Sequence, residues 1–163
     1  MKFQIVVPPS LPGRLPVHPP YGALYIATSL KQEGHEVRVE NGDLDRFSDE
    51  ELLCRISDFS PDVVGISATI STSYKFVKEI SALIKKRFPG IKIIVGGGLS
   101  ASAEVVLKNT AVDIVVIAEG DITVKELAKS FTSYPDLYHS TTTRHKLNSR
   151  AHDDVNPLSL IHI

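Results

Sequence analysis

Short runs of β-branched residues alternate along the chain with segments that show a helical apolar period. The β-branched runs cover residues 3–7, 36–39, 63–66, 91–95 and 113–117. Three of them are nearly continuous in valine and isoleucine, as expected for parallel strands covered on both faces. Helical patterns follow the runs at residues 21–33, 48–59, 73–88, 100–109 and 121–131. These β-then-α units in succession predict an α/β fold with right-handed crossovers.

Residues with strong end preferences mark several helix boundaries. Gly34 suits the C-terminal cap of the first helix. Ser48 precedes Glu51 by three positions, which is the spacing of a capping box at a helix start. Pro89-Gly90 ends the third helix before the next strand. The boundaries therefore agree with the periodicity.

The expected architecture is a doubly wound, three-layer parallel sheet of five strands in the flavodoxin-like (Rossmann-like) order 2-1-3-4-5. Such sheets bind ligands at the carboxyl ends of strands beside the point where the order reverses. The third strand ends at Ser67 and the fourth at Gly96, so their loops meet at one crevice. Glycines leave room for a ligand against the backbone, and hydroxyls can hydrogen-bond it. The crevice floor is predicted to contain Ser67, Thr69, Gly96, Gly97 and Gly98.

Composition narrows the class of protein. The chain has 163 residues, 42% of them hydrophobic, and a formal net charge of -1, so it offers no basic surplus for a nucleic-acid partner. No apolar run approaches the roughly 20 residues that span a bilayer, and Pro8-Pro9 interrupts the first apolar run too early for a signal peptide. We therefore expect a cytoplasmic chain. A single cysteine, Cys54, makes neither a disulfide framework nor an iron–sulfur site, and we expect it to be a buried apolar residue.

Several segments together resemble a known family. They are residues 19–27 (PPYGALYIA), 34–37 (GHEV), 61–67 (PDVVGIS), 96–98 (GGG) and 118–121 (AEGD). Residues 1–131 resemble the N-terminal cobalamin (B12)-binding domain of B12-dependent radical SAM proteins. Residues 132–163 show no helical period, and we expect an irregular tail that begins a truncated following domain.

The resemblance implies that cobalamin binds with its nucleotide tail threaded into the crevice. It implies that Ser67 contacts the benzimidazole and that Gly96-Gly97 lets the tail pass close to the backbone. Glu119-Gly120 resembles half of a Gly-Glu-Gly-Glu element that lies near the nucleotide, although Ala118 and Asp121 replace its outer residues. Thr69, Gly98, Tyr21 and Gly22 complete the cofactor-binding candidates.

Two family motifs are absent. The Asp-x-His-x-x-Gly motif that supplies a cobalt ligand is missing, because Gly22 falls four residues after His18 and no aspartate lies two before it. The resemblance then implies base-off cobalamin, as methylcobalamin or hydroxocobalamin, with no metal ligand and no catalytic residue from this chain. The Cys-x-x-x-Cys-x-x-Cys motif is also missing, so S-adenosylmethionine and an iron–sulfur cluster would belong to a missing downstream radical SAM domain. That domain would carry out methyl transfer or related radical chemistry.

Simpler interpretations remain open. The glycines at 96–98 can form an ordinary strand-to-helix loop, and Ser67 and Thr69 can satisfy local backbone. Glu119 suits a helix start without any ligand, and Tyr21 and Tyr25 are more often core than cofactor contacts. The chain lacks the acidic residues of a response regulator, the glycine motif of a dinucleotide-binding dehydrogenase and the phosphate loop of a flavodoxin. The alternative function is a degenerate α/β domain that has lost its ligand and serves as a docking module.

Overall fold

The predicted alternation of strands and helices is present in the computed structural model, which describes residues 1–9, 19–117, 119–133, 145–148 and 161–162. In chain order the elements are β1 (Lys2–Val7), α1 (Tyr21–Gln32), β2 (Glu36–Asn41), α2 (Gly42–Asp45), α3 (Asp49–Phe59), β3 (Val63–Ser67), the 3-10 turn η1 (Ser71–Ser73), α4 (Tyr74–Arg87), β4 (Lys92–Gly96), the 3-10 turn η2 (Gly98–Ser102), α5 (Ala103–Asn109), β5 (Ile114–Ile117), α6 (Gly120–Ser133), β6 (His145–Asn148) and β7 (Ile161–His162).

The strands form one sheet in the order β2-β1-β3-β4-β5-β6-β7. The first five are parallel, which confirms the predicted order 2-1-3-4-5. β6 pairs parallel with β5, and β7 pairs antiparallel with β6. These two short strands were not predicted, because residues 132–163 carry no periodic pattern. Their backbones extend the sheet beyond β5 all the same.

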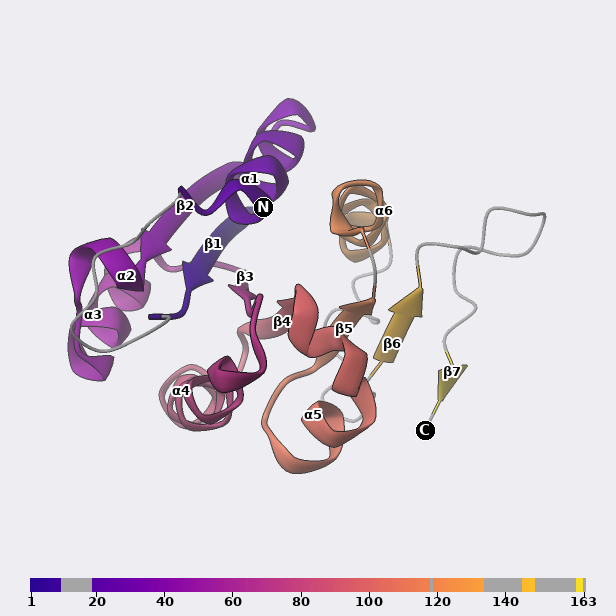
Figure 1. Ribbon diagram of the computed structural model, residues 1–163. Coiled ribbons are helices and arrows are strands. Elements are labelled where there is room, and N and C mark those ends of the chain that lie inside the picture. The colour runs from indigo at the N-terminus through magenta and orange to yellow at the C-terminus, as the bar shows by residue number, and fades with distance from the viewer. Residues whose placement is uncertain (10–18, 118, 134–144, 149–160, 163) are drawn as a thin grey trace.

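Helices cover the two faces of the sheet in two groups. α1 and α6 lie on one face, and α4 and α5 lie on the other (Figure 1). One apolar cluster joins residues of α1 and α6 to alternate residues of the strands. The other cluster joins α3, α4 and α5 to the remaining strand residues. The layers are those of a doubly wound fold.

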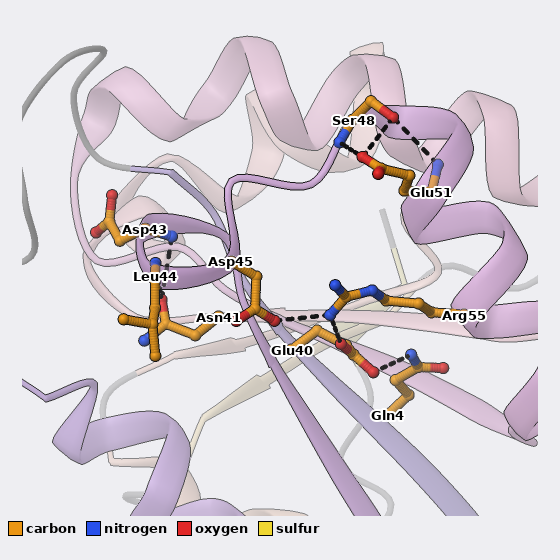
Figure 2. Close-up of polar contacts among 9 residues, drawn as sticks. All are labelled: Gln4, Glu40, Asn41, Asp43, Leu44, Asp45, Ser48, Glu51 and Arg55. Atoms are coloured by element: carbon orange, nitrogen blue, oxygen red, sulfur yellow. Dashed lines mark hydrogen bonds and ion pairs between the residues drawn. The ribbon is translucent and has the colours of Figure 1, made fainter.

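The predicted capping box at the start of α3 is present. The Ser48 backbone N–H donates to Glu51 Oε2 at 2.7 Å, and the Glu51 N–H donates to Ser48 Oγ at 3.3 Å (Figure 2). The Ser48 hydroxyl also donates to Glu51 Oε2 at 2.9 Å. The hydrogen bonds from the Ser48 N–H and hydroxyl stabilise the charged carboxylate, so they hold the pKa of Glu51 below its ordinary value of 4.5.

A polar network connects the edge strand β2, near its carboxyl end, to α3 (Figure 2). Arg55 Nη1 lies 2.6 Å from both Glu40 Oε2 and Asp45 Oδ2. Buried Gln4 donates from Nε2 to Glu40 Oε1 at 3.1 Å. The network therefore joins β1, β2, α2 and α3 through one guanidinium and its two carboxylates.

Two sequence expectations about burial are wrong. Cys54 is exposed, because the buried side of α3 carries Leu52, Leu53, Ile56 and Phe59, and Cys54 lies on the other side.

Tyr21 and Tyr25 are not core residues, since they are 68% and 71% exposed. The buried side of α1 consists of the small residues Ala23, Ala27 and Ser29 together with Leu30. Neither tyrosine lies on that side of the helix.

Within the described residues, no helix combines the length and the apolar character that a membrane span requires.

Candidate functional site

The candidate site lies at the carboxyl ends of β3 and β4. Ser67 and Gly96 are register partners at the last position of their strands, so the two following loops start side by side. Ser67 and Gly96 are half-buried, whereas Thr69, Gly97 and Gly98 are exposed. The structure thus brings together the five residues that were expected at the crevice floor.

The two loops are connected backbone to backbone. The Ala68 N–H donates to the Gly96 carbonyl at 2.9 Å, and the Leu99 N–H donates to the Ala68 carbonyl at 3.0 Å. Gly97 has φ +89°, and a Cβ there would lie 2.8 Å from the Ala68 carbonyl oxygen. A Cβ at Gly98 would collide with the Thr69 carbonyl oxygen. Loop packing alone therefore explains why Gly97 and Gly98 are glycines.

Gly96 differs from the two glycines that follow it. A Cβ on Gly96 would meet no other heavy atom within 4 Å, and no positive φ requires a glycine there. Because Gly96 has no side chain, the space beside it is open, whereas the backbone of Ala68 and Thr69 fills the space beside Gly97 and Gly98. Gly96 is therefore the glycine of the three whose small size the protein's own contacts do not explain.

The open space beside Gly96 belongs to a cleft of about 470 Å³ between the sheet and the helices α1 and α6. Its floor is formed by strand residues on one face of the sheet, and its walls by α1 and α6. The floor residues are Phe3, Ile5, Val63, Gly65, Ser67, Ile94, Gly96 and Val116. A volume of this size is typical of small-molecule and cofactor sites.

The cleft extends along most of the length of β3. β3 contributes Ser67 at the rim and Val63 at the deep end. At about 3.3 Å per residue, these two positions are about 13 Å apart along the strand. The site therefore suits an elongated group that enters from the carboxyl edge of the sheet.

Most of the predicted site residues line this cleft. The lining contains Ser67, Thr69, Gly96, Gly97, Gly22, Glu119 and Gly120. Tyr21 and Gly98 do not belong to it, although Tyr25 does. Glu119 is exposed at the rim, next to the start of α6. Ala118 lies outside the described residues.

Sequence reasoning did not predict the apolar part of the lining, and Gly65 is the residue there that carried a readable signal. It lies in the middle of β3, between Ile5 of β1 and Ile94 of β4 in register. A glycine inside a strand of valine and isoleucine is itself a signal, because such glycines often mark a close approach to a ligand. The glycine within the run Val63-Val64-Gly65-Ile66 could therefore have predicted this lining position.

Polar side chains are confined to the rim of the cleft. Ser67, Thr69, Glu119 and Asp121 provide hydroxyls and carboxylates there, and the exposed Tyr25 of α1 provides a phenol hydroxyl. Among the described residues, no group of three or more histidine, cysteine, aspartate or glutamate side chains is placed to hold a metal ion. The arrangement can enclose an apolar group and hydrogen-bond a polar one at the entrance.

Comparisons with known proteins agree with this geometry. Residues 14–128 match the family model described as the B12 binding domain. The chain is 26% identical over 94% of its length to an uncharacterized methyltransferase of Pyrococcus horikoshii, of which it covers 34%. It is 27% identical over 84% of its length to the anaerobic magnesium-protoporphyrin IX monomethyl ester cyclase of a Synechocystis strain, of which it covers 29%. The chain thus spans about a third of the length of these relatives.

A solved structure shares the fold. The cobalamin-dependent S-adenosylmethionine radical enzyme OxsB, with aqua-cobalamin and S-adenosylmethionine bound, matches 81% of this chain with a TM-score of 0.72 at 18% identity. The chain covers 19% of that enzyme. At this level of identity the match shows a common fold. Since the family model covers most of the chain, including the β3 and β4 loops, the chain belongs to the B12-binding domain family.

Proposed function

We propose that this chain binds cobalamin in the base-off form, with the nucleotide tail in the cleft between the sheet and α1 and α6. We further propose that it is the N-terminal module of a B12-dependent radical SAM enzyme. The observation that carries the proposal is the deep cleft beside Gly96. No contact within the protein requires a glycine at this position, so its lack of a side chain is left for the ligand to explain.

The residues present fit a cobalamin tail. The deep part of the cleft is apolar, which suits an aromatic base, and Ser67 at the rim provides a hydroxyl. Gly96 leaves the backbone accessible to the connecting part of the tail. Residues 1–131 would form this binding module.

The lining of the cleft supports the proposal of the base-off form. A tail bound there would lie away from the cobalt, and among the described lining residues there is no histidine that could replace it as a ligand. His18 lies outside the described residues. Bound cobalamin would supply a cobalt centre able to carry a methyl group. The residues of this chain would bind the tail, orient the cofactor and exclude water from the buried base.

The names of the relatives support the larger context. One relative is called a methyltransferase and the other a cyclase, and the fold is shared with a radical enzyme that has both cobalamin and S-adenosylmethionine bound. Because the chain spans about a third of these relatives, S-adenosylmethionine and the iron–sulfur cluster would bind to a following domain. Methyl transfer or related radical chemistry would take place there.

Titration with hydroxocobalamin tests the binding proposal. The purified chain is mixed with hydroxocobalamin, passed through a gel-filtration column, and its visible spectrum is recorded. We expect about one corrinoid per chain and a base-off spectrum. The Gly96→Val variant should fold and lose the corrinoid, because the new side chain enters the cleft. Gly90→Val is the matched control, since Gly90 also has open space around its Cβ position but does not line the cleft.

Two results would contradict the proposal. A folded chain that retains no corrinoid would favour the alternative of a ligand-free docking module. Equal retention by the Gly96→Val and Gly90→Val variants would place the corrinoid elsewhere on the chain.

A further inference from the structure

The cleft changes character along its length. Its hydroxyls and carboxylates come from Ser67, Thr69, Glu119 and Asp121 at the carboxyl edge of the sheet and from the exposed Tyr25 of α1. The deep half is lined by apolar side chains alone: Phe3, Leu30, Val63, Ile94 and Val124. A group that reaches the deep half therefore finds no side-chain hydrogen-bond partner there.

The backbone offers no partner in the deep half either. β3 lies between β1 and β4, and its residues 63–66 have register partners on both sides. The N–H and carbonyl groups of a central strand are used in the sheet. Gln4, whose Oε1 is buried without a partner, belongs to the same strand as Ile5 but to the neighbouring position, so its side chain lies on the opposite face.

Gly65 adds a notch to the apolar floor. Its register partners are Ile5 of β1 and Ile94 of β4, and both have large side chains. A Cβ on Gly65 would touch only Ile5, with Cγ1 at 3.9 Å. The missing side chain thus leaves space for a flat ring against the sheet, flanked by two isoleucines.

We propose that this cleft selects corrinoids by the chemistry of the lower base, and this inference rests on the proposed function. It accepts a base whose deep edge is apolar, such as dimethylbenzimidazole, and disfavours adenine. Adenine carries ring nitrogens and an exocyclic amine, which would lose their water in the deep half without gaining partners. Leaving such polar groups unpaired weakens binding by about ten- to hundredfold.

The test compares three corrinoids on the full chain. They are cobalamin, the adenine-containing analogue pseudocobalamin, and cobinamide, which has no lower base. Dissociation constants are measured from the visible spectrum, and retention is measured by gel filtration. We expect cobalamin to bind at least about tenfold more tightly than pseudocobalamin, and cobinamide to bind more weakly than cobalamin.

The outcomes separate this inference from the proposed function. Equal affinity for cobalamin and pseudocobalamin, with weak cobinamide, would overturn the base selectivity and leave the tail-in-cleft proposal intact. Equal affinity for cobalamin and cobinamide, or no binding of any corrinoid, would overturn both.

A pair of neighbouring valines provides matched variants. Val63 and Val64 are both fully buried in β3, but Val63 lines the cleft and Val64 faces the other cluster. The Val63→Thr variant places a hydroxyl in the deep cleft, so it should narrow the preference for cobalamin over pseudocobalamin. Val64→Thr should leave the preference unchanged. An unchanged preference in a folded Val63→Thr variant would contradict the inference.

A second variant tests the notch. Gly65→Val adds a branched side chain where the ring is expected to lie. Cobalamin affinity should fall to that of cobinamide, while cobinamide affinity should stay the same. Retained tight binding of cobalamin by this variant would show that the base does not lie over Gly65.

Discussion

The two faces of β3 show how one short strand serves two purposes. On the face covered by α3, α4 and α5, its side chains are Val64 and Ile66, which are 0% and 2% exposed. On the face covered by α1 and α6 they are Val63, Gly65 and Ser67, and the last two are half-buried beside the cleft. Helices cover both faces and pack against buried side chains on each, and the face under α1 and α6 also contains the open cleft. A strand can thus build core with one set of alternate residues and a binding floor with the other.

The two faces also differ in how much they contribute to the free energy of unfolding. A filled face gains dispersion contacts and removes apolar surface from water. A face with an open cleft gives up part of both. If this division is correct, substitutions on the filled face should change stability without changing ligand binding. A substitution that only adds atoms to the open cleft, such as Gly96→Val, should change ligand binding and leave stability nearly unchanged.

The largest stability effect is expected from Ile56→Ala. Ile56 is fully buried in α3, in the cluster on the filled face. Removing its side chain should lower the free energy of unfolding by about 2–5 kcal/mol, because the neighbours cannot fully close the cavity. Urea denaturation measures the loss. Corrinoid retention by the folded variant should equal that of the parent chain, and a loss of retention would break the division between the faces.

A smaller loss is expected from Gly97→Ala. Its φ of +89° and the nearby Ala68 carbonyl make a side chain unfavourable there. We expect the free energy of unfolding to fall by about 1–3 kcal/mol. Gly96→Ala is the comparison, and it should change stability by less than about 0.5 kcal/mol because its Cβ position is open. Equal losses in the two variants, measured by urea denaturation, would refute the distinction between a loop glycine and a cleft glycine.

The smallest of these effects is expected from Ser48→Ala, which removes the cap of α3 on the filled face. Loss of the hydrogen bond from the Glu51 N–H to Ser48 Oγ should cost about 1 kcal/mol of unfolding free energy. Thermal or urea unfolding measures it. Corrinoid retention should not change, because the cap is remote from the lining of the cleft.

The same cap should add a pH dependence. The pKa of Glu51 is lowered in the folded chain, so its contribution to stability is present above the ordinary value of 4.5 and is lost as the pH falls through the folded value. The Glu51→Gln variant should show a weaker decline of stability in this acid range than the parent chain. Parallel curves for the two chains would show that the carboxylate contributes no pH dependence.

Periodicity and end signals predicted much of this fold. The Ser48 and Glu51 spacing gave the start of α3, and the order of the first five strands followed from the succession of β-then-α units. These features depend on local sequence and on general rules of chain connection. The same information located the cleft rim at Ser67 and Gly96.

What the sequence did not predict depends on contacts between distant segments. The role of Gly97 requires knowledge that Ala68 approaches it, which no local pattern contains. Cys54 shows that residues within an amphipathic helix differ in burial according to the face they occupy. The strands β6 and β7 form through backbone pairing, which places little demand on side-chain pattern.

Ligand binding in the cleft would also link the stability of the folded protein to the supply of the ligand. A ligand that binds only the folded chain adds RT ln(1 + [L]/Kd) to the free energy of unfolding, or about 2.7 kcal/mol at a hundredfold excess over Kd. Chains made when corrinoid is scarce would open more often and meet proteases more readily. Under the proposed function, binding in the cleft would therefore make the abundance of the domain follow the abundance of its cofactor.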